Sequence, residues 1–302
     1  PAAPPAEPSA AEDRPRVPAV PASSLVLVRP GAGGEISVFT VRRAGTMAFS
    51  AHATAFPGGR VDPADDLSDR LWEGTDLADW GRRLGLPHEP VDAHGTLTEL
   101  DPAEGAGRVL AAAVRETFEE TGVLLARDAV TGTPVDPARV AAFPDELRDA
   151  VERHEVDFGE LLDREGLRPD AGALVPWSRW ITPHGGPRRY DTFFFAVHLP
   201  QGQSPERMSS EAASHGWASP AELLRRFRAG KVNLMAPTWW QLRTLVDAGE
   251  DVHAGRSRFE PLEGVMLVAG QGPVFPHADE YLRDLTAFRA AAQVEESKDN
   301  IL

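Results

Sequence analysis

Three glutamates crowd one short stretch of this sequence, and their spacing predicts metal chemistry. Glu116, Glu119 and Glu120 stand at positions i, i+3 and i+4, so on an α-helix the three carboxylates share one face within a turn. Like charges this close repel unless a cation or a basic partner offsets the repulsion. Hard divalent ions favour oxygen ligands of this kind. We therefore expect Mg²⁺ or Mn²⁺ at this helix face.

Two neighbouring residues support the predicted helix. Arg115 precedes Glu119 by four residues and is expected to brace it with a charge-assisted hydrogen bond. Gly122 is expected to end the helix, because glycine adopts the left-handed conformation at little cost. An isolated Glu-x-x-Glu-Glu would more often be a solvated acidic surface. The interpretation as a site therefore depends on a second motif.

That second motif is a glycine-rich turn upstream. Residues 56–59 read Phe-Pro-Gly-Gly, and the absent Cβ atoms let the backbone approach a ligand or metal closely. Residues 115–123 read Arg-Glu-x-x-Glu-Glu-x-Gly-Val. Together the two motifs resemble a Nudix box split by an insertion. In the Nudix family this box forms a loop-helix-loop that holds divalent metal against a nucleoside-diphosphate-linked substrate.

The resemblance has departures from the uninterrupted box, which reads G-x₅-E-x₇-R-E-U-x-E-E-x-G-U with U a bulky aliphatic residue. Counting from Gly59, the first acidic position falls on Asp65 instead of Glu, and Thr117 stands at an aliphatic position. The box arginine arrives only after a long insertion. Interrupted boxes with this opening are characteristic of the branch that resembles the mammalian peroxisomal coenzyme A diphosphatase.

Further segments resemble the same branch in the same order, and the similarity covers the chain from about Ser24 to Leu245. The matching segments are residues 38–43, 47–49, 177–183, 188–194, 217–220 and 236–238. The resemblance implies the fold class α/β, with a Nudix-type α/β/α sandwich, a mixed sheet and a mostly helical insertion inside the box.

The resemblance also implies roles for particular residues in metal binding and catalysis. Glu119 and Glu120 would be direct metal ligands. Glu116 would be either a ligand or the base that deprotonates the attacking water. The carbonyl of Gly59 would be a further oxygen ligand, and Glu211 is the candidate ligand from outside the box.

Arginines are the candidates for binding substrate phosphates. Arg188 and Arg189 precede an apolar strand, a placement from which guanidinium groups can contact phosphate oxygens in pairs. Arg42 stands at the end of a strand that leads to the Phe-Pro-Gly-Gly turn. The alternative for all three is an ordinary surface arginine. We interpret Arg115 as a residue that orients the catalytic carboxylates. The alternative is that Arg115 forms only an ordinary ion pair within the helix.

The pattern of apolar residues along the chain predicts the strands and helices that position these residues. Apolar runs at 25–28 and 36–41 flank a Gly-rich turn and predict a hairpin. Residues 174–181 and 192–199 are further strand candidates. Helices are predicted over residues 108–121, 157–164, 220–229 and 239–248. Interleaved strands and helices indicate an α/β or α+β class.

We divide the chain into one domain and two tails. Residues 1–22 are rich in Pro and Ala and predicted to be disordered. Residues 23–288 form a single Nudix domain, and 289–302 form a polar C-terminal tail. Within the domain, residues 62–107 are rich in Asp, Gly and Pro with isolated Leu and Trp. They predict an insertion packed on the surface of the host domain.

Composition excludes several classes of function. The chain has 31 basic and 46 acidic residues, a net charge of −15, which disfavours nucleic acid as a partner. It has no cysteine, which removes disulfides, thiolate zinc sites and thiol nucleophiles. No uninterrupted apolar run approaches the roughly 20 residues that span a bilayer, and the start lacks the pattern of a signal peptide. We expect a cytoplasmic protein with no membrane partner.

The leading hypothesis is a metal-dependent pyrophosphohydrolase that cleaves the diphosphate of coenzyme A or acyl-CoA to 3′,5′-ADP and (acyl-)4′-phosphopantetheine. One alternative keeps the chemistry and changes the substrate to ADP-ribose, a dinucleotide or another nucleoside diphosphate derivative. A second is a non-catalytic, nucleotide-binding regulatory Nudix domain, against which the complete set of acidic residues argues. The insertion could also mediate self-association as a homodimer.

Overall fold

A mixed β-sheet forms the centre of the protein, whose computed structural model describes residues 17–43, 52–86, 100–182, 188–205, 212–248 and 275–299. The strand order is β10-β3-β2-β1-β8-β7, while β4 pairs with β1 and β9 with β2. The strands are β1 (Ala19–Pro30), β2 (Ile36–Arg43), β3 (Ala53–Ala55), β4 (Gly58–Arg60), β7 (Val175–Ile181), β8 (Arg189–His198), β9 (Ala212–Ala218) and β10 (Asn233–Leu234).

Strand β1 is the central element of this sheet. It pairs in parallel with β8 from Ala19 to Val28, and antiparallel with β2 and β4. The predicted hairpin of β1 and β2 is present, and its turn contains Gly33 and Gly34 at positive φ. Ser23 of β1 pairs with Gly59 of β4. The sheet therefore holds the Gly-Gly turn directly against its most buried strand.

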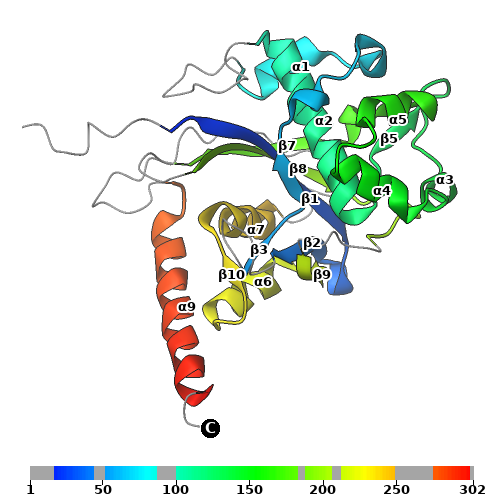
Figure 1. The fold of residues 1–302 in the computed structure, drawn as a ribbon. Coiled ribbons are helices and arrows are strands. Elements are labelled where there is room, and N and C mark those ends of the chain that lie inside the picture. Colours follow the sequence, from blue (N-terminus) through cyan, green and yellow to red (C-terminus); the bar gives the residue numbers. More distant parts are fainter. Residues whose placement is uncertain are drawn as a thin grey trace, which may run out of the picture.

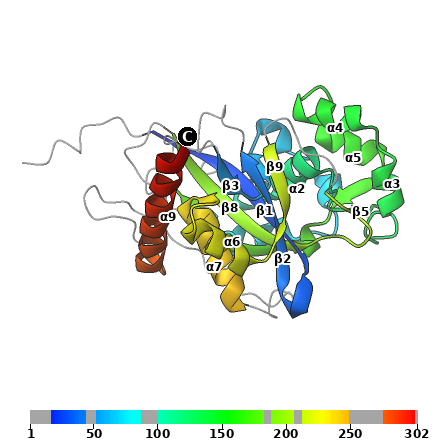
Figure 2. The same cartoon turned by 90° about the horizontal axis from the view of Figure 1, so that it is seen from below.

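Helices cover both faces of the sheet (Figures 1 and 2). Side chains alternate between the faces of a strand, and here both faces are apolar: Leu25 and Leu27 join one core cluster, while Val26 and Val28 join the other. All four are fully buried. This arrangement confirms the predicted α/β class with a mixed sheet between two helical layers.

The first layer is built on helix α2 (Pro102–Thr121), which crosses β1 where the Ser23 hydroxyl donates a hydrogen bond of 2.7 Å to the carbonyl of Val109. Aspartates cap several of its helices, and Asp157 accepts from the N–H of Glu160 at 2.8 Å as expected for a helix start. The other elements are α1 (Leu77–Arg83), α3 (Pro137–Ala141), α4 (Asp145–Glu152), α5 (Phe158–Arg164), the 3-10 helices η2 (Pro63–Asp65), η3 (Asp69–Trp72) and η4 (Ala171–Ala173), and the strands β5 (Ala126–Asp128) and β6 (Leu167–Pro169).

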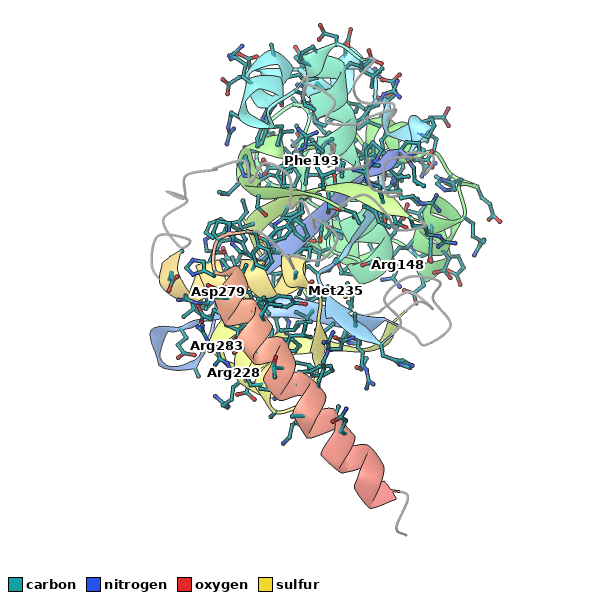
Figure 3. The ribbon with its side chains drawn as sticks, turned by 90° about the vertical axis from the view of Figure 1, so that its left-hand side faces the viewer. Arg148, Phe193, Arg228, Met235, Asp279 and Arg283 are labelled. Carbon is teal, nitrogen blue, oxygen red and sulfur yellow. The ribbon has the colours of Figure 1, made fainter. Side chains whose placement is uncertain are left out.

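The second layer consists of α6 (Pro220–Arg228), α7 (Ala236–Ala248) and α9 (Ala278–Asp299). Ser219 caps α6 by accepting from the N–H of Glu222 at 3.2 Å, as predicted. Helix α9 packs on α6, where Arg228 donates to Asp284 at 2.7 Å (Figure 3). None of the helices in the described part of the chain is long and apolar enough to cross a membrane.

Described secondary structure extends into both predicted tails. Strand β1 begins at Ala19, inside the predicted N-terminal tail 1–22, because residues 19–22 gain backbone partners on β8. Residues 1–16 lie outside the described ranges. The predicted polar tail 289–302 is helical as far as Asp299. The apolar residues Tyr281, Leu285 and Phe288, which pack on the second core cluster, have the spacing that would have predicted this helix.

The predicted insertion, residues 62–107, contributes to the first core cluster. Its large apolar side chains in that cluster are Leu67, Leu71, Trp72, Trp80, Leu84 and Leu86. Helix α2 begins at Pro102, six residues before the predicted start, because Asp101 caps it by accepting from the N–H of Ala103 at 2.9 Å. Residues 87–99 are not described. The division into one domain with two tails stays a prediction.

Candidate active site

The acidic residues predicted to bind metal lie on the last two turns of α2. The helix ends at Gly122, whose φ of 75° is left-handed and whose N–H donates to the carbonyl of Phe118 at 2.8 Å. The predicted stop is therefore present. Glu119 is buried, whereas Glu116 and Glu120 are half-buried. The partly and fully buried glutamates thus differ from the solvated acidic surface that was the alternative interpretation of this helix.

Arg115 is the centre of the hydrogen bonds on this face. Its Nε and Nη2 donate to the two carboxylate oxygens of Asp65 at 2.8 and 3.0 Å. Its Nη1 donates to Glu116 at 3.0 Å and to both oxygens of Glu119 at 3.1 Å. The remaining contact joins Nη2 to the carbonyl of Arg60 at 3.0 Å. The expected brace between Arg115 and Glu119 is thus one part of a larger network.

Asp65 occupies the first acidic position of the box and contacts the box arginine. Its side chain is 1% exposed, and its Oδ2 also accepts from the N–H of Asp62 at 2.7 Å. Together with Asp62 it forms the capping box of η2. The short carboxylate is therefore held from both sides and fixes the plane of the guanidinium of Arg115.

The Gly58-Gly59 turn lies against the acidic helix. A Cβ atom on Gly59 would stand 2.4 Å from the carboxylate of Glu116, and Gly58 has a φ of 147° with the carbonyl of Ser23 only 2.2 Å from its Cβ position. No other residue type fits at either position without displacing its neighbours. The N–H of Gly58 also donates to Glu120 at 3.2 Å. The turn thus brings backbone atoms into contact with two of the three glutamates.

Burial makes negative charge costly at this site. It raises the pKa of Glu116 to about 7, although Arg115 acts in the opposite direction. Burial likewise raises the pKa of Glu119, against Arg115 and with further repulsion from Asp65 and Glu152. Burial alone would lower the pKa of Arg115, but its bonds to Asp65 and the nearby carboxylates raise it, so the guanidinium stays charged. Three carboxylates share this one cation.

The donor set fits a hard divalent cation. The site has more carboxylates than basic side chains, and the carbonyls of the Gly58-Gly59 turn lie next to them. Oxygen ligands of these kinds are the ones that Mg²⁺ and Mn²⁺ take. Glu116, Glu119, Glu120 and the Gly59 carbonyl would hold the ion. Across the described ranges no three His, Asp or Glu side chains form a ready-made cation site. On this helix face Arg115 hydrogen-bonds both Glu116 and Glu119.

Metal affinity is expected to depend on pH through Glu116. With a pKa of about 7 when folded and an ordinary value of 4.5, Glu116 stabilises the metal-free fold most fully below pH 4.5, and this stabilisation is lost as the pH rises to about 7. A cation must displace the proton. We therefore expect Mn²⁺ affinity, measured by EPR titration, to rise roughly tenfold per pH unit between about pH 5 and 7. In Glu116→Gln the binding of Mn²⁺ should release about one proton fewer, so the affinity should depend less steeply on pH. Equal Mn²⁺ affinities at pH 5 and pH 7 in the unmodified protein would contradict the assignment of Glu116 to the metal site.

The predicted phosphate-binding arginines lie in different environments. Arg42, near the end of β2, and Arg188, just before β8, are both exposed. Arg189 is buried and donates to the carbonyls of Thr182 and Val17, each at 2.8 Å. These bonds tie the start of β1 to β8 and favour the structural interpretation of Arg189. Glu211, the candidate ligand from outside the box, lies outside the described residues.

Glu152 is an acidic neighbour of the site that the sequence did not reveal. It is the last residue of α4, and its charge contributes to the raised pKa of Glu119. The two residues are 33 positions apart, and α4 reaches α2 through tertiary packing. No local spacing rule connects them, so the sequence contained no signal for this contact.

Asp65 is expected to act by positioning Arg115. Asp65→Asn keeps the shape of the side chain but removes one acceptor of the paired hydrogen bonds. Loss of a partner that orients a metal-binding group typically costs roughly 10- to 100-fold, so we expect kcat to fall by that factor and Mg²⁺ affinity to weaken with it. Asp66→Asn is the matched control, because Asp66 is exposed and pairs with Arg108. Unchanged kcat and Mg²⁺ affinity in a folded Asp65→Asn variant would show that Arg115 needs no orienting partner.

Comparison with known proteins shows the family of this chain. A family model described as the NUDT19 Nudix domain matches residues 17–245. The acyl-coenzyme A diphosphatase NUDT19 of Gallus gallus is 34% identical over 230 residues, which make up 67% of this chain and 59% of the relative. Its counterpart in Homo sapiens is 28% identical over 305 aligned positions, covering 91% of this chain and 80% of the relative. The chain thus spans less than two thirds of the length of the chicken protein.

A solved structure supports the same fold. The crystal structure of a NUDIX hydrolase from Alicyclobacillus acidocaldarius is 29% identical, with a TM-score of 0.57. The match covers 79% of this chain and 96% of that protein. The two proteins therefore share the overall fold over most of their lengths.

Proposed function

This chain belongs to the Nudix family, with a domain of the NUDT19 type, and from that premise we propose that it is a metal-dependent diphosphatase acting on coenzyme A or acyl-coenzyme A. The observation that carries the proposal is the acidic end of α2, where Arg115 gathers Asp65, Glu116 and Glu119. The two relatives named above are acyl-coenzyme A diphosphatases, which supports the choice of substrate.

The residues of the site would have different roles in diphosphate hydrolysis. A divalent cation, Mg²⁺ or Mn²⁺ in this proposal, would neutralise charge on the diphosphate and make a water more acidic when bound. The Glu116 carboxylate would either bind this ion or accept a proton from the attacking water, the two roles open to a carboxylate at this position. Arg115 holds Glu116 and Glu119 in place. The Gly58-Gly59 turn places its backbone directly against Glu116 and Glu120.

The expected products follow from the bond that breaks. Water attacks a phosphorus of the diphosphate, and the bridging oxygen leaves with the other phosphate. The 3′-phosphate and any thioester are untouched. Coenzyme A should therefore give 3′,5′-ADP and 4′-phosphopantetheine, and an acyl-CoA should give the acylated phosphopantetheine.

A substrate panel tests the proposal. Coenzyme A, acetyl-CoA and ADP-ribose are incubated at matched Mg²⁺, and the products are identified by mass spectrometry. We expect both coenzyme A compounds to be cleaved in preference, and chelation to abolish turnover until Mg²⁺ or Mn²⁺ is restored. AMP from ADP-ribose as the dominant product, with coenzyme A intact, would overturn the substrate and leave the Nudix chemistry standing. The cytoplasmic location and a homodimer stay predictions.

A further inference from the structure

An exposed arginine lies over a tryptophan ring at the edge of the sheet. The guanidinium carbon of Arg29, near the end of β1, stands 4.1 Å from the centroid of the Trp217 ring on β9. Arg29 is exposed, Trp217 is half-buried, and His215, two residues earlier on β9, is exposed. In the part of the chain that the structure describes, no carboxylate forms an ion pair with Arg29. We call Arg29, Trp217 and His215 the β9 ledge.

The register of the strands places the β9 ledge on the same face of the sheet as helix α2. Paired residues of adjacent strands point to the same face. Trp217 pairs with Phe39 of β2, and the two rings meet edge to face with centroids 5.4 Å apart. His215 pairs with Val41. Phe39 and Val41 belong to the first core cluster together with Phe118 of α2, so the β9 ledge continues the sheet face on which the acidic helix packs.

The β9 ledge also lies on the side of β1 where the acidic end of α2 is found. Strand β8 occupies one edge of β1, and β2 and β4 share the other. Helix α2 crosses β1 and reaches β4 with its last turn, where the N–H of Gly58 donates to Glu120 at 3.2 Å. Val41 lies between His215 on β9 and Ala55 on β3. Two strand spacings, roughly 10 Å, thus separate His215 from the segment that leads into the Gly58 turn.

The contact with Trp217 leaves Arg29 able to bind an anion. A guanidinium that is held over an aromatic ring keeps N–H donors free, and the fork of these donors matches the oxygens of a phosphate. The ring also restricts the long side chain, so less conformational entropy is lost when an anion binds. The chain has a net charge of −15, so an additional substrate phosphate requires a local cation. Arg29 supplies one outside the acidic site.

Building on the function proposed above, we propose that Arg29 binds the 3′-phosphate of coenzyme A and that Trp217 positions its guanidinium. The 3′-phosphate is carried by the ribose next to the diphosphate. A substrate whose diphosphate lies at the acidic end of α2 therefore presents this phosphate to the neighbouring part of the sheet face. ADP-ribose lacks the 3′-phosphate, so the contact selects coenzyme A among the substrates considered above.

Dephospho-coenzyme A tests this assignment, because it lacks only the 3′-phosphate. We expect the unmodified protein to favour coenzyme A by about tenfold or more in kcat/KM, the usual size of a hydrogen-bonded contact to a charged group. Arg29→Gln should lose that preference by cleaving coenzyme A less efficiently, while its kcat/KM for dephospho-coenzyme A stays within about twofold of the unmodified protein. Arg283→Gln is the matched control, because Arg283 is also exposed but lies on α9 in the second layer (Figure 3).

The same ratio of the two substrates tests the positioning role of Trp217. Trp217→Phe keeps an aromatic face for the guanidinium and should retain most of the preference, whereas Trp217→Leu should lose most of it. General damage to the fold would lower kcat/KM for both substrates alike and leave their ratio unchanged. An unchanged ratio in Trp217→Leu would show that Arg29 needs no ring to position it.

Nucleotide binding gives a readout that does not depend on turnover. Isothermal titration calorimetry should show that 3′,5′-ADP binds the unmodified protein about tenfold more tightly than AMP does, and that Arg29→Gln binds both equally. Equal affinities in the unmodified protein, or an Arg29→Gln variant that loses equally on both substrates or on neither, would overturn the assignment. If the unmodified protein cleaves neither coenzyme A compound, the proposed function fails. A preference for 3′,5′-ADP that Arg29→Gln abolishes would then still support the β9 ledge as a phosphate site.

Discussion

Replacing Glu120 by Gln should lower kcat by about 1,000-fold or more, the equivalent of roughly 4 kcal/mol of transition-state stabilisation. The amide keeps the shape of the side chain but removes the negative charge that would hold the cation. Its oxygen can still accept from the N–H of Gly58, which donates to Glu120 at 3.2 Å. The variant should therefore keep the fold, and its loss should come from metal binding. Steady-state kinetics at several Mg²⁺ concentrations and a thermal melt measure the two effects separately.

Glu119→Gln should lose as much activity and some stability as well. Both oxygens of Glu119 accept from Nη1 of Arg115 at 3.1 Å, and an amide would turn its NH₂ group toward a donor. A lost hydrogen bond of a charged group costs about 1.5–3 kcal/mol, so this variant should melt below Glu120→Gln.

Glu104→Gln is the control for both glutamates. Glu104 lies in the first turn of the same helix, is exposed, and pairs with Arg108 at 2.8 Å. Its kcat should equal that of the unmodified protein. A folded Glu120→Gln variant with full turnover would mean that this helix face does not bind the catalytic metal.

The parts of the site that lie close together in the chain could be predicted from the sequence, because helix geometry alone places them. The spacing of Glu116, Glu119 and Glu120 predicted that their carboxylates share one helix face, and Gly122 predicted where the helix ends. The pattern of the box also brought Asp65 to attention across 50 positions, although it did not show that Asp65 pairs with Arg115 through two hydrogen bonds.

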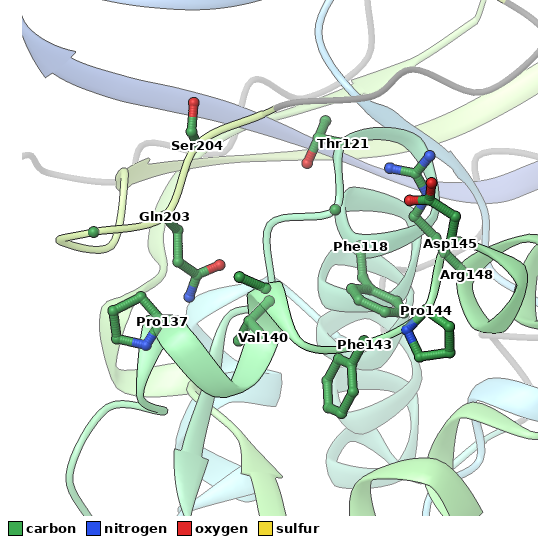
Figure 4. A pocket seen from close by; sticks show the side chains of 13 residues that line it. Phe118, Thr121, Pro137, Val140, Phe143, Pro144, Asp145, Arg148, Gln203 and Ser204 are labelled. Carbon is green, nitrogen blue, oxygen red and sulfur yellow. The ribbon is translucent and has the colours of Figure 1, made fainter.

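The parts that depend on tertiary packing could not be predicted. Glu152 reaches Glu119 only because α4 packs on α2. Arg189 was a candidate for binding phosphate, and its Nε and Nη1 donate to the carbonyls of Thr182 and Val17, which the pairing of β8 with β7 and with β1 brings near. The pocket lined by Phe118, Phe143 and Gln203 likewise forms only where three segments of the chain meet (Figure 4).

The insertion shows the same limit. Its Leu and Trp residues looked isolated along the chain, and composition alone suggested a surface accessory. In the fold Trp80 is 6% exposed, lies edge to face with Phe195 of β8 at 6.3 Å, and has the guanidinium of Arg83 over its ring at 4.0 Å. Gly81 passes so close to α2 that a Cβ would stand 2.7 Å from the carbonyl of Pro102. The insertion thus shares its core with the sheet and with the catalytic helix.

Trp80→Ala should therefore destabilise the whole protein by about 3–5 kcal/mol, the usual cost of removing a buried Trp. That is a large share of the roughly 5–15 kcal/mol by which folded proteins are stable, and it should lower the melting temperature by roughly 10 °C. Because α2 packs on the same cluster as Trp80, far-UV and near-UV circular dichroism should report one transition at the lower temperature, and activity should disappear in that same transition. Val130→Ala is the control, since Val130 is 94% exposed and its loss should change stability by less than about 0.5 kcal/mol. A Trp80→Ala variant that melts and loses activity at the temperature of the unmodified protein would mean that the insertion does not share its core with the rest of the fold.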